Sequence, residues 1–100
     1  MIPEQKIAEL SNIFNALGNE TRLKILLIAS QNDRPLHIKA YARLLKKRYS
    51  AVYRHISILH RAGLVTIYEV GRSRVVALRK GLDIGTLIRA LASVGIITDE

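Results

Sequence analysis

Hydrogen-bond donors recur at helical spacing between residues 50 and 61. At 3.6 residues per turn, one side of this segment carries hydroxyl and guanidinium groups and no carboxylate. Such groups can donate to phosphate oxygens and to base edges in the major groove of DNA. The candidate DNA contacts on this side are Ser50, Tyr53, Arg54 and Ser57. The alternatives are an ordinary exposed helix face and, for Tyr53, a role in shielding the helix surface.

Basic residues are concentrated around this segment. From Arg34 to Lys80 the sequence has twelve Lys and Arg residues and one acid, Glu69. Two groups in this span are further candidate DNA contacts: Lys46, Lys47 and Arg48 before the helix, and Arg72 and Arg74 beyond it. The first group would contact the phosphate backbone, and the second would lie beside the minor groove. The same charge could also belong to a solvated basic surface.

Residues for other kinds of chemistry are scarce. The absence of cysteine excludes disulfides and thiolate metal ligands. His55 and His60 are five positions apart, so they lie on different faces of a helix, and His37 is distant in sequence. His55 falls in the apolar arc of its helix, which favours a packed histidine with a local hydrogen bond. We expect no metal site, no cofactor and no enzyme activity, since no phosphate loop, carboxylate pair or nucleophile constellation is recognisable.

A helix-turn-helix would position the donors. The opposite face of residues 50–61 is apolar and consists of Val52, Ile56 and Leu59. Residues 39–46 predict a preceding helix with Ala42 and Leu45 facing inward. Two helices joined by a short turn, the second one polar outside, are typical of the helix-turn-helix motif.

The pattern then changes to an alternation of period two, which predicts a β-hairpin over residues 64–79. Its strands would be 64–70 and 74–79, joined by a turn at 71–73. A hairpin with a basic tip directly after a recognition helix is a wing. Residues 36–38 could add a short strand.

Amphipathic helices are predicted at both ends of the chain. The first lies within residues 1–18 and can close at Gly18 in the left-handed conformation. The last lies within residues 83–95 and has a similar apolar stripe. Two such helices around a small domain favour a two-fold dimer, in which the recognition helices would lie about 34 Å apart.

A central helix is predicted over residues 20–30, with Asn19 as its N-cap. Its apolar residues occupy more than one side, and we expect all of them to pack inside: Leu23, Ile25, Leu26, Leu27 and Ile28. Arg22 is either structural or in contact with the DNA backbone.

The length fits a single domain, residues 1–100, that is mainly α with a small β-hairpin. Charged residues interrupt the apolar positions near the N-terminus, so no signal sequence is predicted, and no apolar run is long enough to cross a bilayer. Together with the absence of cysteine, this leads us to expect a cytoplasmic protein.

Three segments together carry a resemblance to a known family. They are Leu-Gly-Asn-Glu-Thr-Arg-Leu-Lys-Ile-Leu at 17–26, Ser-Ala-Val-Tyr-Arg-His-Ile at 50–56 and Leu-His-Arg-Ala-Gly-Leu-Val at 59–65. In this order and spacing the chain resembles the arsenic-repressor (ArsR) type of winged helix-turn-helix transcription regulator. The resemblance implies a dimeric, repressor-like protein, paired through its first and last helices, with one recognition helix per subunit in the major groove of a roughly palindromic site.

The ligands of metal-sensing relatives are missing from this sequence. Those relatives carry a Cys-x-Cys pair at the start of the third helix, where this chain has His37 and Lys39. A second sensing site uses an Asp-x-His pattern early in the last helix and further ligands near its end. The matching positions here are Asp83, Gly85, Ile96 and Asp99. The resemblance therefore implies the scaffold without either metal detector.

From these patterns we expect a homodimeric regulator that reads double-stranded DNA by sequence, with an unknown small-molecule effector if there is one. Two other classes remain open. One is a DNA- or RNA-binding or architectural protein that does not read sequence. The other is a winged helix that binds an acidic protein partner.

Overall fold

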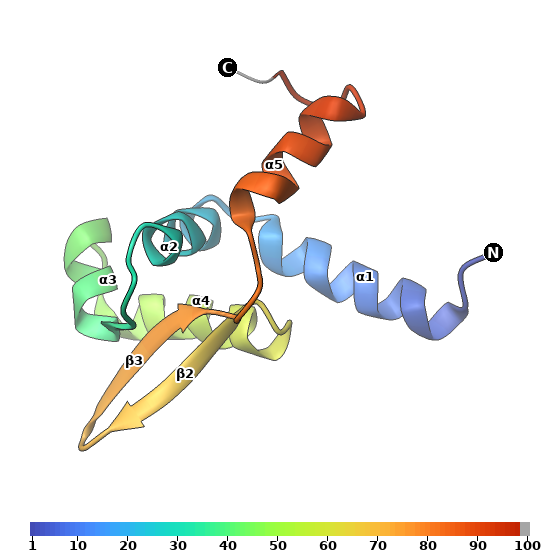
Figure 1. The fold of residues 1–100 in the computed structure, drawn as a ribbon. Coiled ribbons are helices and arrows are strands. Elements are labelled where there is room, and N and C mark those ends of the chain that lie inside the picture. Colours follow the sequence, from blue (N-terminus) through green and yellow to red (C-terminus); the bar gives the residue numbers. More distant parts are fainter. Residues whose placement is uncertain (99–100) are drawn as a thin grey trace.

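The computed structural model describes residues 1–98, and that part of the chain forms five helices and three strands. In order they are α1 (Glu4–Leu17), α2 (Glu20–Ser30), β1 (Leu36–His37), α3 (Ile38–Leu45), α4 (Tyr49–Arg61), β2 (Val65–Val70), β3 (Ser73–Leu78) and α5 (Ile84–Ser93). Figure 1 shows α2, α3 and α4 gathered beside the hairpin of β2 and β3. This is a winged helix-turn-helix, mainly α with a small antiparallel sheet, so the predicted fold class is confirmed. None of the helices described is long and apolar enough to cross a membrane.

The sheet has the strand order β1-β3-β2 and is antiparallel throughout. The predicted short strand forms, with Leu36 paired to Val76 on the central strand β3. It is one residue shorter than expected, because Ile38 begins α3.

The hairpin turns within two residues, since Val70 pairs with Ser73. Gly71 takes the first loop position with a φ of 62°. A two-residue loop of type II′ requires positive φ at that position, which glycine adopts without a steric penalty. The tight turn therefore leaves Arg72 at the tip of the wing.

The core lies where α2, α3 and α4 meet the sheet. Its largest fully buried side chains are Tyr41, Ile25, Leu26, Ile38, Ile56, Leu59, Val52 and Val76. The predicted inner face of α4, which consists of Val52, Ile56 and Leu59, is confirmed.

Only one of the two apolar sides of α2 belongs to the core. Ile25 and Leu26 are fully buried, but Leu23 and Leu27 are 44% and 42% exposed. The expectation that all these residues pack inside is wrong for Leu23 and Leu27. At 100° per residue the mean direction of Leu23 and Leu27 is about 130° away from that of Ile25 and Leu26, and a helix on one side of a small core can bury only part of its circumference.

Tyr41 also lies on the inner side of α3, where only Ala42 and Leu45 were predicted. Its ring is fully buried, and its hydroxyl donates to the carbonyl oxygen of Val76 at 2.9 Å. Burial raises the pKa of Tyr41 to about 12, so the phenol stays protonated and able to donate. The hydrogen bond ties α3 to the central strand.

The junction of α1 and α2 differs from the expected one. Asn19 caps α2 as predicted, since its Oδ1 accepts from the backbone N–H of Arg22 at 3.1 Å. The expectation for Gly18 is wrong, because its φ is −80°. The end of α1 is closed instead by the Arg22 guanidinium, which donates to the carbonyl oxygens of Ala16 and Asn15 at 2.6 and 3.1 Å.

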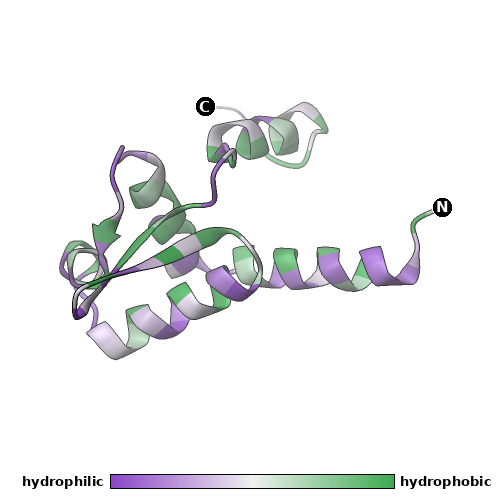
Figure 2. Cartoon of the chain, turned by 60° about the horizontal axis from the view of Figure 1, so that its bottom comes forward, coloured by the Kyte–Doolittle hydropathy of each residue, from purple (hydrophilic) through white to green (hydrophobic). Residues whose placement is uncertain are grey.

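Helices α1 and α5 extend away from the core in different directions (Figure 1). The radius of gyration is accordingly 14.4 Å, above the roughly 13 Å of a compact chain of this length. Figure 2 shows hydrophobic positions along both helices. Ile7 and Phe14 on α1 and Ile88 on α5 are exposed. A single chain therefore leaves apolar surface on each terminal helix.

Candidate nucleic-acid interface

The outer face of α4 is open to solvent. The helix packs against α1, α2, α3 and β2 through its apolar side. Ser50 and Arg54 lie on the opposite side and are exposed. A partner that lies along the outer side of α4 can therefore reach both Ser50 and Arg54.

Ser57 and Tyr53 are half-buried and less free than the other two. The Ser57 hydroxyl donates to the backbone carbonyl oxygen of Tyr53 at 2.9 Å. Its proton is thus held within the helix, and Ser57 offers a partner mainly an acceptor oxygen.

One flank of α4 is tied to the wing. The rings of Tyr49 and Tyr53 stack, with centroids 6.4 Å apart and planes 4° from parallel. The Arg74 guanidinium lies 5.2 Å from the centroid of the Tyr53 ring and donates to the Tyr53 hydroxyl at 2.7 Å. Cation–π contact and hydrogen bond together fix the angle between wing and recognition helix.

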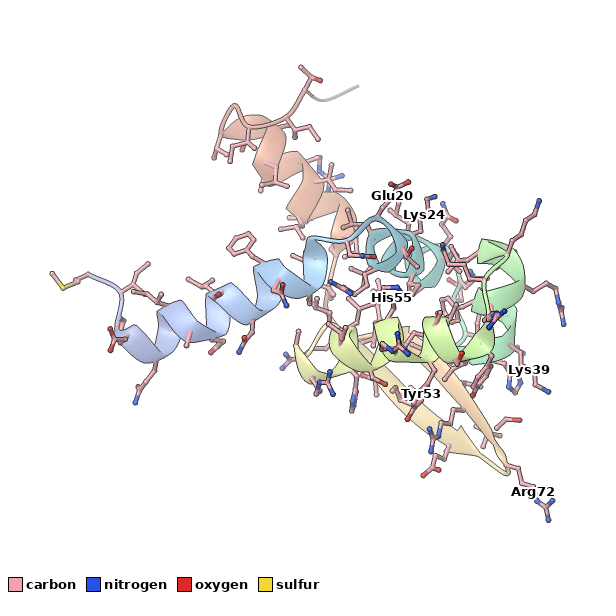
Figure 3. The ribbon with its side chains drawn as sticks, turned by 180° about the vertical axis from the view of Figure 1, so that it is seen from behind. Glu20, Lys24, Lys39, Tyr53, His55 and Arg72 are labelled. Carbon is pink, nitrogen blue, oxygen red and sulfur yellow. The ribbon has the colours of Figure 1, made fainter. Side chains whose placement is uncertain are left out.

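The two predicted wing residues therefore lie in different settings. Arg72 is exposed in the hairpin loop, and Figure 3 shows its side chain at the tip, directed away from the molecule. Arg74 is on β3, opposite Glu69, and points back to α4 through its contact with Tyr53. Within residues 1–98, Arg74 is engaged by Tyr53, whereas the Arg72 side chain forms no hydrogen bond or ion pair.

The other flank of α4 is tied to α2. The Arg22 guanidinium lies 3.0 Å from Nδ1 of His55. A guanidinium only donates, so Nδ1 must accept and the ring proton of neutral His55 sits on Nε2. The expected local hydrogen bond of His55 is thus replaced by one to a residue 33 positions away.

The surroundings of His55 favour its neutral form. Burial lowers the pKa of His55 below its usual value, and the positive charges of Arg22, Lys47 and Arg54 lower it further. Arg22 itself is buried and directs three donors into the protein. Of the two roles left open for Arg22, the structural one agrees with this geometry. No local sequence signal links these two residues.

The three basic residues of the turn before α4, Lys46, Lys47 and Arg48, are all exposed. Lys46 ends α3 in the left-handed conformation, with a φ of 56°. Arg48 occupies the N-cap position of α4 without a capping hydrogen bond from its side chain.

Carboxylates do not neutralise this basic surface. Among residues 1–98 the ion pairs are Lys6 with Glu9 and Lys24 with Glu20, each at 3.3 Å and exposed. Both lie outside the span 34–80, whose twelve cations form none of the ion pairs present in the described residues. An uncompensated cluster of this kind attracts polyanions.

Histidine and carboxylate side chains are dispersed. In the part of the chain that the structure describes, no three of them come together in a way that could hold a metal ion. Asp83 instead caps α5, with its carboxylate accepting from the backbone N–H and hydroxyl of Thr86. Asp99, the last of the positions compared with metal-sensing relatives, lies outside the described residues.

The fold is shared with several solved regulators. An ArsR-like transcriptional regulator from Rhodococcus sp. RHA1 is 28% identical, with a TM-score of 0.70 over 94% of this chain and 84% of that chain. HlyU from Vibrio cholerae N16961 is 24% identical, with a TM-score of 0.72 over 95% and 100% of the two chains. The homodimeric winged helix-turn-helix DNA-binding domain Mb0332 from Mycobacterium bovis, a possible ArsR-family transcriptional regulator, is 20% identical, with a TM-score of 0.74 over 99% and 96%.

No curated protein matches the sequence significantly. The sequence model of the HVO_A0114 family, in contrast, matches residues 19–81, which run from the N-cap of α2 to just beyond the wing. Since this match covers more than half of the chain, the protein belongs to the HVO_A0114 family, and its winged helix-turn-helix is of the ArsR type.

Proposed function

We propose that the protein is a sequence-specific double-stranded DNA-binding transcription regulator, repressor-like, that binds a roughly palindromic site as a homodimer. The observation that carries this proposal is the outer face of α4, which is exposed, bears donors and no carboxylate, and is surrounded by cations that form none of the ion pairs found within residues 1–98. Transcription regulators among the proteins of the same fold support it.

Ser50 and Arg54 are assigned to base edges, because they are the exposed predicted donors of α4. A guanidinium can donate two hydrogen bonds to guanine, which makes Arg54 the main specificity residue. Tyr53 and Ser57 would contribute packing against bases or an acceptor oxygen. The remaining contacts are assigned to phosphates and the minor groove: Lys46, Lys47, Arg48, Arg72 and Arg74.

The exposed apolar faces of α1 and α5 support a homodimer. Apolar side chains on two protruding helices favour association with a second copy of the chain through a two-fold axis. Such a pair would place the two α4 helices about 34 Å apart, one turn of DNA. The Mycobacterium bovis domain of the same fold is homodimeric.

A protein that coats DNA or RNA without reading sequence is the second candidate. One observation favours it: Ser57 uses its proton within α4, which leaves fewer free donors for base edges. The cations of the turn and the wing tip would still bind phosphates of any sequence.

Selection of bound fragments from random duplex DNA separates the two candidates. A sequence-specific dimer should enrich an inverted repeat whose half-sites are about one helical turn apart, and binding should persist with excess nonspecific duplex present. Recovery of fragments without a common sequence, together with loss of binding to competitor, would refute sequence reading and favour the second candidate.

A further inference from the structure

A cleft of about 260 Å³ separates the wing from the start of α3. It is lined by residues from three parts of the chain, among them His37, Lys39, Tyr49, Arg72, Ser73 and Arg74. In Figure 3, Lys39 and Arg72 lie on the same side of the molecule. The cleft thus brings together elements more than thirty residues apart in sequence.

The cleft is cationic. Three of its lining residues, Lys39, Arg72 and Arg74, carry positive charge, and no carboxylate of residues 1–98 lines it. None of the ion pairs found within residues 1–98 involves these three. Like charges that line one cleft repel one another, and a bound anion would relieve this repulsion.

The donors suit an oxyanion with several oxygens. Lys39 offers an exposed ammonium, and Arg72 an exposed guanidinium whose fork matches two phosphate oxygens. Arg74 is held in place by Tyr53 at the rear of the group, so one wall of the cleft is preorganised. The volume is several times that of a water molecule and can admit a phosphate group with its hydration.

We propose that this cleft binds a single phosphate group, which in the DNA complex is one backbone phosphate held between the wing and α3. The proposal rests on the DNA-binding function proposed above for its physiological ligand, while the same donors would also accept free inorganic phosphate. In this proposal Lys39 and Arg72 bind the same phosphate group. Wing and helix-turn-helix are then linked through the DNA and not only through Tyr53.

Charge-removing variants test this with duplex DNA. Lys39→Gln and Arg72→Gln should each weaken binding about fivefold to tenfold at low salt and reduce the slope of log affinity against log salt by about 1 per subunit. The double variant should lose less than the product of the two single losses, because both residues serve one phosphate. The matched control is Lys24→Gln on α2, where Lys24 is exposed and paired with Glu20. It loses the same charge and should leave the slope unchanged.

Neutral methylphosphonate links, placed one at a time in the duplex, locate the phosphate. One position in each half-site should weaken binding of the natural protein and have no further effect on Lys39→Gln. If the natural protein binds DNA while both cleft variants behave like Lys24→Gln, the cleft proposal is overturned and the DNA-binding function stands.

A titration with inorganic phosphate tests the cleft independently of DNA binding. Inorganic phosphate is exchanged for chloride at constant ionic strength, and amide NMR shifts are followed at Lys39, Arg72 and Ser73. Shifts with duplex, with or without shifts with phosphate, assign the site to the DNA backbone. Saturable shifts with phosphate alone, absent in Lys39→Gln, assign the site to a free oxyanion. In that case the cleft proposal stands and the proposed DNA-binding function fails. Shifts with neither ligand overturn the proposal.

Discussion

Arg22 connects three helices through one side chain. It starts on α2, donates to the carbonyl oxygens of Ala16 and Asn15 at the end of α1, and reaches His55 on α4. Buried charges are costly unless every donor finds a partner, and here the partners come from α1 and α4. The residue thereby fixes the recognition helix relative to the helix proposed for dimerisation.

The burial of His55, together with the positive charge of Arg22 beside it, should make stability depend on pH. Folding lowers the pKa of His55, so between about pH 6.5 and the lower folded pKa the unfolded chain binds more protons than the folded one. The contribution of His55 is therefore complete above about pH 6.5 and is lost as the pH falls through the folded pKa. Melting temperatures measured from pH 8 to pH 5 should fall more steeply for the natural protein than for His55→Gln, whose amide oxygen can still accept from Arg22. Parallel curves would contradict this role.

Arg54 and Lys46 should differ in what they contribute to DNA binding. Arg54→Ala removes an exposed guanidinium from the outer face of α4 and should weaken binding to a selected site by about 10- to 100-fold, with a smaller effect on random duplex. Lys46→Ala removes a charge before the helix and should weaken both kinds of binding alike. Competition titrations with the two duplexes give both ratios, and equal ratios in the two variants would refute the division.

At the scale of elements, the short turn between α3 and α4 contains one strained residue. Lys46 has a φ of 56°, which places its Cβ in an unfavourable position that glycine avoids. Lys46→Gly should therefore raise the free energy of unfolding by about 0.5–1 kcal/mol relative to Lys46→Ala, which removes the same charge and keeps the Cβ. Urea denaturation measures the difference, and a glycine variant no more stable than the alanine variant would show that the turn is not strained.

Local periodicity predicts most of the elements, because the positions of Val52, Ile56 and Leu59 on one helical face are a property of the segment itself. Contacts between elements are not encoded locally. The pairing of Arg22 with His55 and the choice of which apolar side of α2 faces the core depend on the packed arrangement.

In the candidate interface, too, some features can be predicted from the local sequence and others depend on contacts between elements. Its residues on α4 could be selected from spacing and donor chemistry alone. The engagement of Tyr53 by Arg74 could not, since it needs the register of the hairpin and the angle of the wing. The cleft beside α3 is equally invisible in the sequence, where Lys39 and Arg72 are far apart.

At the scale of the whole molecule, the cations of residues 34–80, which form no ion pair within the described part of the chain, should govern the salt dependence of DNA binding. A dimer that neutralises on the order of eight phosphates should show a slope of log affinity against log salt of about −7. Affinities measured from low to moderate salt give the slope directly. A flat response would refute electrostatic binding by the surface between residues 34 and 80.

The apolar faces of the terminal helices should determine the oligomeric state. Light scattering of the natural protein should give about twice the chain mass of 11.2 kDa. Phe14→Glu places a charge on the exposed face of α1 and should shift the protein to monomers, since a charge in an apolar interface loses its hydration. Leu44→Glu on α3 is the matched control, because Leu44 is 61% exposed and Phe14 60%. If both variants remain dimeric, or only Leu44→Glu dissociates, α1 is not the dimer surface and the spacing of the two recognition helices must be set by another face.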